Sequence, residues 1–207
     1  MHGPKMIFSS ACTSRPAPTS PPHILLEHEI ESLLYLAKQV DRRAYMMILL
    51  AVNTGLRNSE LIGLDIEDVT PYGEITPILE VRAAIAKNHE PRSIPLRPLV
   101  RHELGLYVKS ICNSESSSAG NLPLFRSLRG PRRLSPRDFQ RLLHDLSVQA
   151  LGRKIHPHML RHTFATRLLR VSNLRIVQQI LGHKNLQSTQ IYTHPSSDDL
   201  ADAVNKL

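Results

Sequence analysis

One stretch of the chain is apolar on nearly every side. The segment from Arg43 to Thr54 contains Met46-Met47-Ile48-Leu49-Leu50-Ala51-Val52. A helix of this kind is stable only where other elements cover it all round. Gly55 follows directly, and glycine commonly ends a helix because it adopts the left-handed conformation without strain. The sequence therefore predicts a buried central helix that other helices surround.

Several other segments carry apolar residues at helical spacing. Ser135-Pro136-Arg137-Asp138 is a strong helix start, because serine caps, proline suits the first position and aspartate the third. In the segment after Leu96 we expect Leu99, Leu104 and Val108 to face inward. The predicted surrounding helices cover residues 26–40, 58–64, 96–111, 135–151, 158–170, 173–181, 186–192 and 197–206.

Between residues 74 and 96 the pattern changes to that of β-strands. Residues 78–82 and 93–96 are the expected strands, and Lys87-Asn88-His89-Glu90 forms the turn between them. Pro95 cannot donate a ladder hydrogen bond, so its strand lies at an edge or ends there. The predicted fold class is mainly α with a small antiparallel β-sheet (α+β).

The composition favours a polyanionic partner. Lys and Arg outnumber Asp and Glu by 26 to 18, giving a net charge of +8. Such a balance suits nucleic acid first and an anionic membrane surface second. No apolar run approaches the roughly 20 residues that cross a bilayer. Two cysteines and no secretory leader fit a reducing interior, so we expect a cytoplasmic, nucleoid-associated protein.

The first residues differ in composition from the rest. Residues 1–24 are rich in serine and proline and cannot bury enough apolar surface to offset their ordering entropy. We expect them to form a disordered linker or tail. The remaining residues, 25–207, are long enough for one domain with a substantial core.

One arginine and two histidines share one predicted helical face. His158, Arg161 and His162 lie at i, i+3 and i+4. A solvated basic face is the simplest interpretation of the cluster alone. A zinc site is disfavoured, because the segment lacks the glutamate of a metalloprotease helix and an arginine would repel the ion. We therefore predict no metal.

Two further segments could bring cations to a phosphate. Arg57 lies just after the Gly55 break, where it could clamp a phosphate, and Glu60 could orient its guanidinium. The alternative is an ordinary helix start with a capping carboxylate. Lys87 at the turn could reach into a DNA groove, although lysines at hairpin tips usually serve solubility.

A third candidate histidine, His183, follows His158 and His162, and Tyr192 comes shortly after it in the sequence. Tyrosine is a poor nucleophile, since its unperturbed pKa is about 10. It needs a base and a charge-neutralised phosphorus to react near neutral pH. Arg57, Arg161 and the histidines could supply both, so we interpret the combination as a phosphodiester-cleaving site.

The same segments resemble the tyrosine recombinase (phage integrase) family, specifically its catalytic domain. They occur in the family's order, and the resemblance covers about residues 25–207. The segment 85–96 resembles the hairpin that bears the family's catalytic lysine, although Ala86 and Asn88 stand where glycines are usual. The boxes are Thr54–Leu61 (first arginine), His158–Thr166 (His-x-x-Arg), Leu181–His183 and Thr189–His194 (nucleophile).

The resemblance implies site-specific DNA recombination, by integration or excision, through a 3′-phosphotyrosyl intermediate. Tyr192 would attack the scissile phosphodiester, and His158 would take or help to take its proton. Arg57 and Arg161 would neutralise the non-bridging oxygens. No nucleotide cofactor or metal would be required, because the covalent link keeps the phosphoester energy.

The remaining roles also follow from the resemblance. His183 would hydrogen-bond the phosphate, and Lys87 would protonate the leaving 5′-oxygen. Glu60 would orient the arginines and the histidine, with His162 in support.

The resemblance also implies partners. Double-stranded DNA would be the substrate, and a homotetramer on DNA would form with the helix of residues 197–207 docked on a neighbouring subunit. Family members carry an N-terminal core-binding domain that closes around DNA, and we expect it to be absent from residues 1–207.

Two alternatives remain open from the sequence. A type IB topoisomerase-like enzyme would use the same chemistry to relax supercoils. A DNA-binding catalytic-domain fragment, inactive without its N-terminal domain, would bind without cleaving.

Overall fold

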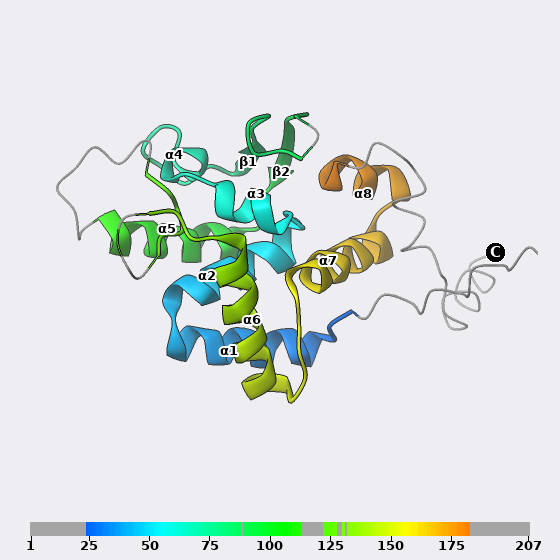
Figure 1. Cartoon of the computed structure of the whole chain (residues 1–207). Helices are drawn as coiled ribbons and strands as arrows, with labels where there is room; N and C mark the ends of the chain where they lie inside the picture. Colours follow the sequence, from blue (N-terminus) through cyan, green and yellow to red (C-terminus); the bar gives the residue numbers. More distant parts are fainter. Residues whose placement is uncertain (1–23, 88, 113–121, 128–129, 131, 183–207) are drawn as a thin grey trace, which may run out of the picture.

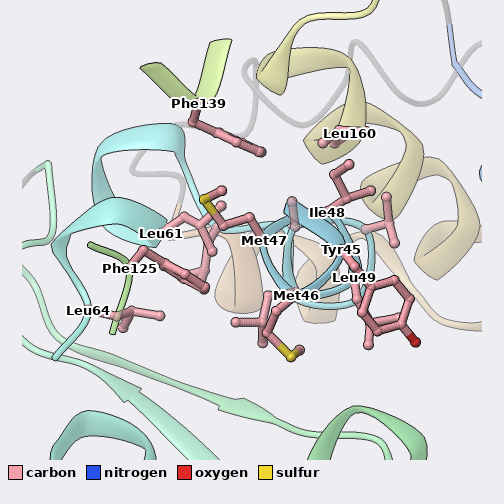
Figure 2. Packing of buried hydrophobic residues seen from close by; sticks show 14 of the residues in the cluster. Tyr45, Met46, Met47, Ile48, Leu49, Leu61, Leu64, Phe125, Phe139 and Leu160 are labelled. Atoms are coloured by element: carbon pink, nitrogen blue, oxygen red, sulfur yellow. The ribbon is translucent and has the colours of Figure 1, made fainter. Parts of the chain in front are cut away.

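Helix α2 (Arg42–Thr54) runs through the middle of the molecule (Figure 1). The computed structural model describes residues 24–87, 89–112, 122–127, 130 and 132–182. Around α2 pack α1 (Glu27–Val40), α5 (Pro98–Cys112), α6 (Pro136–Leu151) and α7 (Pro157–Val171). Figure 2 shows side chains from several faces of α2 meeting apolar partners such as Phe139 and Leu160. The predicted buried central helix is confirmed.

Both ends of α2 are fixed by local hydrogen bonds. The Asp41 side chain accepts from the backbone N–H of Arg43 (2.8 Å) and of Ala44 (3.3 Å), which caps the first turn. Gly55 ends the helix in the left-handed conformation (φ +63°) and donates its N–H to Ala51. A Cβ at Gly55 would lie 2.3 Å from Cδ1 of Phe164, so α7 packs directly against this bend.

The other described helices follow the predicted pattern with small differences. Ser135 caps α6 through its Oγ, which accepts from the N–H of Asp138 (3.1 Å), as expected. Helices α3 (Asn58–Gly63) and α8 (Leu174–Leu181) are also confirmed. The short helix α4 (Ile66–Val69) was not predicted. The helices expected at 186–192 and 197–206 lie outside the described residues.

The prediction for Leu99 was wrong. Leu99 is 57% exposed, whereas its neighbour Val100 is buried. Helix α5 begins at Pro98, and its inward face is set by Val100, Leu104 and Tyr107, with Val108 at the edge of the core. None of the described helices is long and apolar enough to cross a membrane.

Two short strands form the predicted antiparallel sheet. Strand β1 (Ile78–Val81) pairs with β2 (Arg92–Pro95), with Ile78 opposite Pro95 and Val81 opposite Arg92. Strand β2 ends at Pro95, as the missing N–H of proline requires. The register places Arg92 at the end of the sheet nearest the connection of residues 82–91.

A small second core joins α8 to α7. Ala165 of α7 packs with Val177 and Leu181 of α8, and the partly buried Phe164 and Leu168 lie against them. Helix α8 also contacts β2, so its C-terminal end lies near α7, β2 and the Gly55 bend (Figure 1). Elements far apart in the sequence therefore converge at the end of α8.

Gly55→Ala should destabilise the fold more than Gly152→Ala. Both glycines are left-handed (φ +63° and +66°), which costs a residue with a Cβ about 1–2 kcal/mol. Only Gly55 would also press a Cβ into Phe164 and Leu181, and such overpacking adds about 1–3 kcal/mol. Urea unfolding of both variants measures the difference. Equal losses of unfolding free energy would contradict the packing at the bend.

Candidate active site

The carboxylate of Glu60 lies at the centre of the predicted site. It is fully buried in the first turn of α3. Its Oε1 accepts from Nη1 of Arg57 (2.8 Å) and Nη1 of Arg92 (3.0 Å). Its Oε2 accepts from the backbone N–H of Arg57 (2.8 Å) and Nη2 of Arg92 (2.7 Å). Glu60 is therefore both a helix cap and an ion-pair partner.

The two arginines decide the charge of Glu60. Burial alone would raise the pKa of this carboxyl, because a low-dielectric surrounding disfavours the ion. The hydrogen bonds and positive charge of Arg92, with the hydrogen bonds of Arg57, outweigh burial and lower the pKa to about 2. The carboxylate is thus ionised at neutral pH, and it forms a hydrogen-bonded ion pair with Arg57.

Arg161 is buried, contrary to a solvated basic face. Only 2% of it is exposed, and its guanidinium points inward from α7. Nη1 donates to the carbonyl of Gly55 (2.6 Å), and Nη2 donates to the carbonyl of Leu181 (2.8 Å). Arg161 thereby connects the end of α2 to the end of α8.

Three arginines meet at the C-terminal end of α8. The last carbonyls of a helix lack partners within the helix and carry partial negative charge. Those of residues 180, 181 and 182 accept from Arg92 (Nε, 2.9 Å), Arg161 and Arg57 (Nη2, 3.2 Å) respectively. The side chains come from β2, α7 and the N-cap of α3. The end of α8 and the Glu60 carboxylate together gather a strong positive charge.

The two histidines of α7 form a pair. The rings of His158 and His162 meet edge to face with centroids 4.4 Å apart. Desolvation lowers the pKa of His158, and the charges of Arg161, Arg57 and Lys87 lower it further. Burial, with the charges of His158 and Arg161, lowers the pKa of His162 to about 4. Both rings are mainly neutral at pH 7, so His158 can accept a proton.

Lys87 lies in the connection between β1 and β2, as predicted. Its side chain is exposed, while the adjacent Ala86 is buried. The positive charge of Lys87 is one of several that lower the pKa of His158. Among the described residues of this connection His89 is left-handed (φ 55°), and Asn88 lies outside the described residues.

A cleft opens beside this cluster between β2 and α8. Its volume is about 530 Å³, and Arg57 and Arg92 line it together with Arg175 and Gln178 of α8. Asn173 positions α8 by capping it, since its Oδ1 accepts from the N–H of Ile176 (3.0 Å). Glu90 also lines the cleft, but the three arginines outnumber it, and the positive lining suits a phosphate group.

The structure brings together Arg57, Glu60, Arg161, His158 and His162, with Lys87 nearby. His183 and Tyr192 lie outside the described residues. The sequence prediction missed a role for Arg92, which it placed only in the hairpin segment of residues 85–96, just before the predicted strand 93–96. Arg92 stands two positions before the inward-facing Ile94, on the same face of the strand, and a charge on that face was the available signal. Among the described residues, no three His, Cys, Asp or Glu side chains are grouped to hold a metal.

Comparison with known sequences decides the family. Residues 23–198 match the sequence profile of the phage integrase family. The chain belongs to that family. A tyrosine recombinase of Pseudothermotoga lettingae is 34% identical over 188 residues, which are 90% of this chain and 61% of that protein. Tyrosine recombinase XerA of Pyrococcus furiosus is 34% identical over 192 residues, 91% of this chain and 63% of that protein.

Solved structures of phage integrase family relatives share the fold. The crystal structure of XerA recombinase has a TM-score of 0.76 at 32% identity and covers 91% of this chain and 66% of its own. XerH recombinase bound to its difH substrate has a TM-score of 0.69 at 25% identity, with coverages of 90% and 55%. This family member thus spans less than two thirds of the length of the two recombinase sequences named above.

His162 should stay neutral down to about pH 4 in the folded protein. Its folded pKa (about 4) lies below the unfolded value of 6.5, so the unfolded state binds more protons between these values. The free energy of unfolding should therefore fall as pH drops from 6.5 towards 4, and less so in His162→Asn. NMR titration of the ring, assigned with that variant, measures the pKa. A midpoint near 6.5 would show that the ring is not desolvated.

Proposed function

We propose that this chain carries the catalytic region of a site-specific DNA recombinase. The observation that supports it most is the convergence of Arg57, Arg161 and the neutral His158 beside a cationic cleft. Anionic phosphate complements this charge, and neutral histidine can serve as a base. The chain leaves the cluster at Gly182, and the nucleophile box with Tyr192 follows in the same segment.

In the proposed reaction the phenol oxygen of Tyr192 attacks the scissile phosphorus. An oxygen–phosphorus bond forms, and the bond from phosphorus to the 5′-oxygen breaks. The phenol proton passes to His158, and Lys87 gives a proton to the leaving 5′-oxygen. The products are a 3′-phosphotyrosyl link and a 5′-hydroxyl. Attack by the 5′-hydroxyl of another strand reverses the steps. One phosphoester bond replaces another in each direction, so no nucleotide cofactor is needed.

The cations would act on the charge that builds at phosphorus. Arg57 and Arg161 would bind the non-bridging oxygens of the phosphate. Their hydrogen bonds to the carbonyls at the end of α8 would be replaced by bonds to phosphate, and His183 would add a further hydrogen bond. Losing one such donor typically costs about 10²–10³ in rate. The role of Glu60 is to hold Arg57 at the cleft.

Double-stranded DNA is the proposed partner. XerH is a relative whose structure contains its difH substrate, and a net charge of +8 suits a polyanion. We further propose that residues 25–207 act as one catalytic domain. Four copies would assemble on DNA, with residues 197–207 of each copy docked on a neighbouring copy.

Tyr192→Phe should abolish covalent capture of DNA. A library of nicked duplexes with randomised sequence, quenched in detergent, reports adducts and identifies the preferred site. Wild-type protein should form an adduct that the variant lacks, while gel-shift binding of both stays equal, since only the nucleophilic oxygen is removed.

An adduct that persists in Tyr192→Phe would refute the assignment of the nucleophile. Binding without any wild-type adduct would favour a DNA-binding module. Relaxation of plasmids without strand exchange between two sites would favour topoisomerase-like activity.

A further inference from the structure

We propose that Arg92 is a positioning residue: by sharing the Glu60 carboxylate, it keeps the guanidinium of Arg57 turned towards the cleft. The proposal rests on the proposed function, since the task assigned to Arg57 is to bind the scissile phosphate. Arg92 lines the cleft but would act through Arg57, because its three guanidinium nitrogens are held by Glu60 and the carbonyl of Ile180.

The first support is how the two oxygens of the Glu60 carboxylate are shared between Arg92 and Arg57. Arg92 approaches Glu60 as a fork, with Nη1 on one oxygen (3.0 Å) and Nη2 on the other (2.7 Å). Arg57 has only one guanidinium nitrogen on Glu60, and its second reaches the carbonyl of Gly182. Arg92 thus occupies the bidentate position and leaves the guanidinium of Arg57 a single contact with Glu60.

The second support is that Arg92 is held rigidly. Its Nε donates to the carbonyl of Ile180 (2.9 Å), so all three of its nitrogens bind protein groups. Its side chain is only 7% exposed, against 20% for Arg57. A Cβ on Gly182 would lie 3.1 Å from Cδ of Arg92, which shows how closely α8 covers it. Arg57 is the more accessible of the two arginines.

The consequence of losing Arg92 follows from the buried charge. Glu60 would remain a buried carboxylate with Arg57 as its main cation, and a bidentate pair is the stronger arrangement. Both terminal nitrogens of Arg57 would then turn to Glu60, away from Gly182 and the cleft. The catalytic set would keep every member, yet one of its arginines would point in the wrong direction.

A merely structural role for Arg92 predicts a different outcome, and Arg82 provides the matched control. Arg82 follows β1 in the same hairpin and is also a carboxylate clamp. It donates from Nε and Nη2 to Asp68 (2.6 and 2.8 Å), from Nη2 to Asp65, and from Nη2 to the carbonyl of Gly63 (3.3 Å). Arg82→Gln removes a comparable ion pair without touching Glu60.

The kinetic test measures the rate of covalent adduct formation on the nicked duplex that wild type prefers. It compares wild type, Arg92→Gln, Arg92→Lys and Arg82→Gln. One substrate carries the normal scissile phosphodiester, and the other a methylphosphonate, which lacks the negative charge that the arginines neutralise. On the phosphodiester, Arg92→Gln should slow adduct formation by about 10²-fold, as for one lost donor. Arg92→Lys should recover part of the rate. The loss in Arg92→Gln should shrink on the methylphosphonate.

Arg82→Gln should lower the melting temperature yet match wild type in rate on both substrates. Equal slowing of Arg92→Gln on the two substrates would overturn the proposal, as would an equal loss in Arg82→Gln. An unchanged rate in Arg92→Gln would overturn it as well.

A crystal structure of Arg92→Gln separates this proposal from the proposed function. Arg57 should be bidentate on Glu60 and detached from Gly182. If wild type forms no adduct but Arg57 turns in this way, the recombinase assignment fails and the positioning role stands. If Arg57 keeps its place, the positioning role fails whatever the activity.

Discussion

The arrangement of the site depends on one buried carboxylate. Glu60 is fully buried, and an isolated ion there would be strongly unfavourable. Two guanidiniums and a backbone N–H offset that cost. Because Arg57 is the N-cap of α3 and Arg92 lies on β2, the same carboxylate ties the helical core to the sheet. The negative charge of Glu60 orients the positive charges of Arg57 and Arg92.

The end of α8 is the second half of this arrangement. Arginines from three elements donate to its last carbonyls, so the helix terminus acts as a template for the cations. Gly55 makes this possible, since any side chain there would collide with Phe164 and push α7 away from the bend. The buried helix α2 therefore determines where Arg161 meets α8.

Much of this could be predicted from the sequence, for physical reasons. The all-round apolar run of α2 allows only a buried helix, and the Ser135 cap and the Gly55 stop are local rules. His158, Arg161 and His162 were found because helical spacing groups them, and Arg57 and Glu60 because they follow the Gly55 break. Arg92 was not, because its partner lies 32 positions away and strand spacing carries no information about that pairing. Leu99 was misassigned because two adjacent apolar residues compete for one inward position.

The most direct test of this account is the pKa of the Glu60 carboxyl, measured by ¹³C NMR. The account predicts a side-chain carboxyl shift that stays constant from pH 7 to 3.5, because the arginines hold the pKa near 2. Comparison with Glu60→Gln assigns the signal. A titration with a midpoint above 4.5 would mean that burial outweighs the arginines, and it would contradict the charge arrangement on which the site is built.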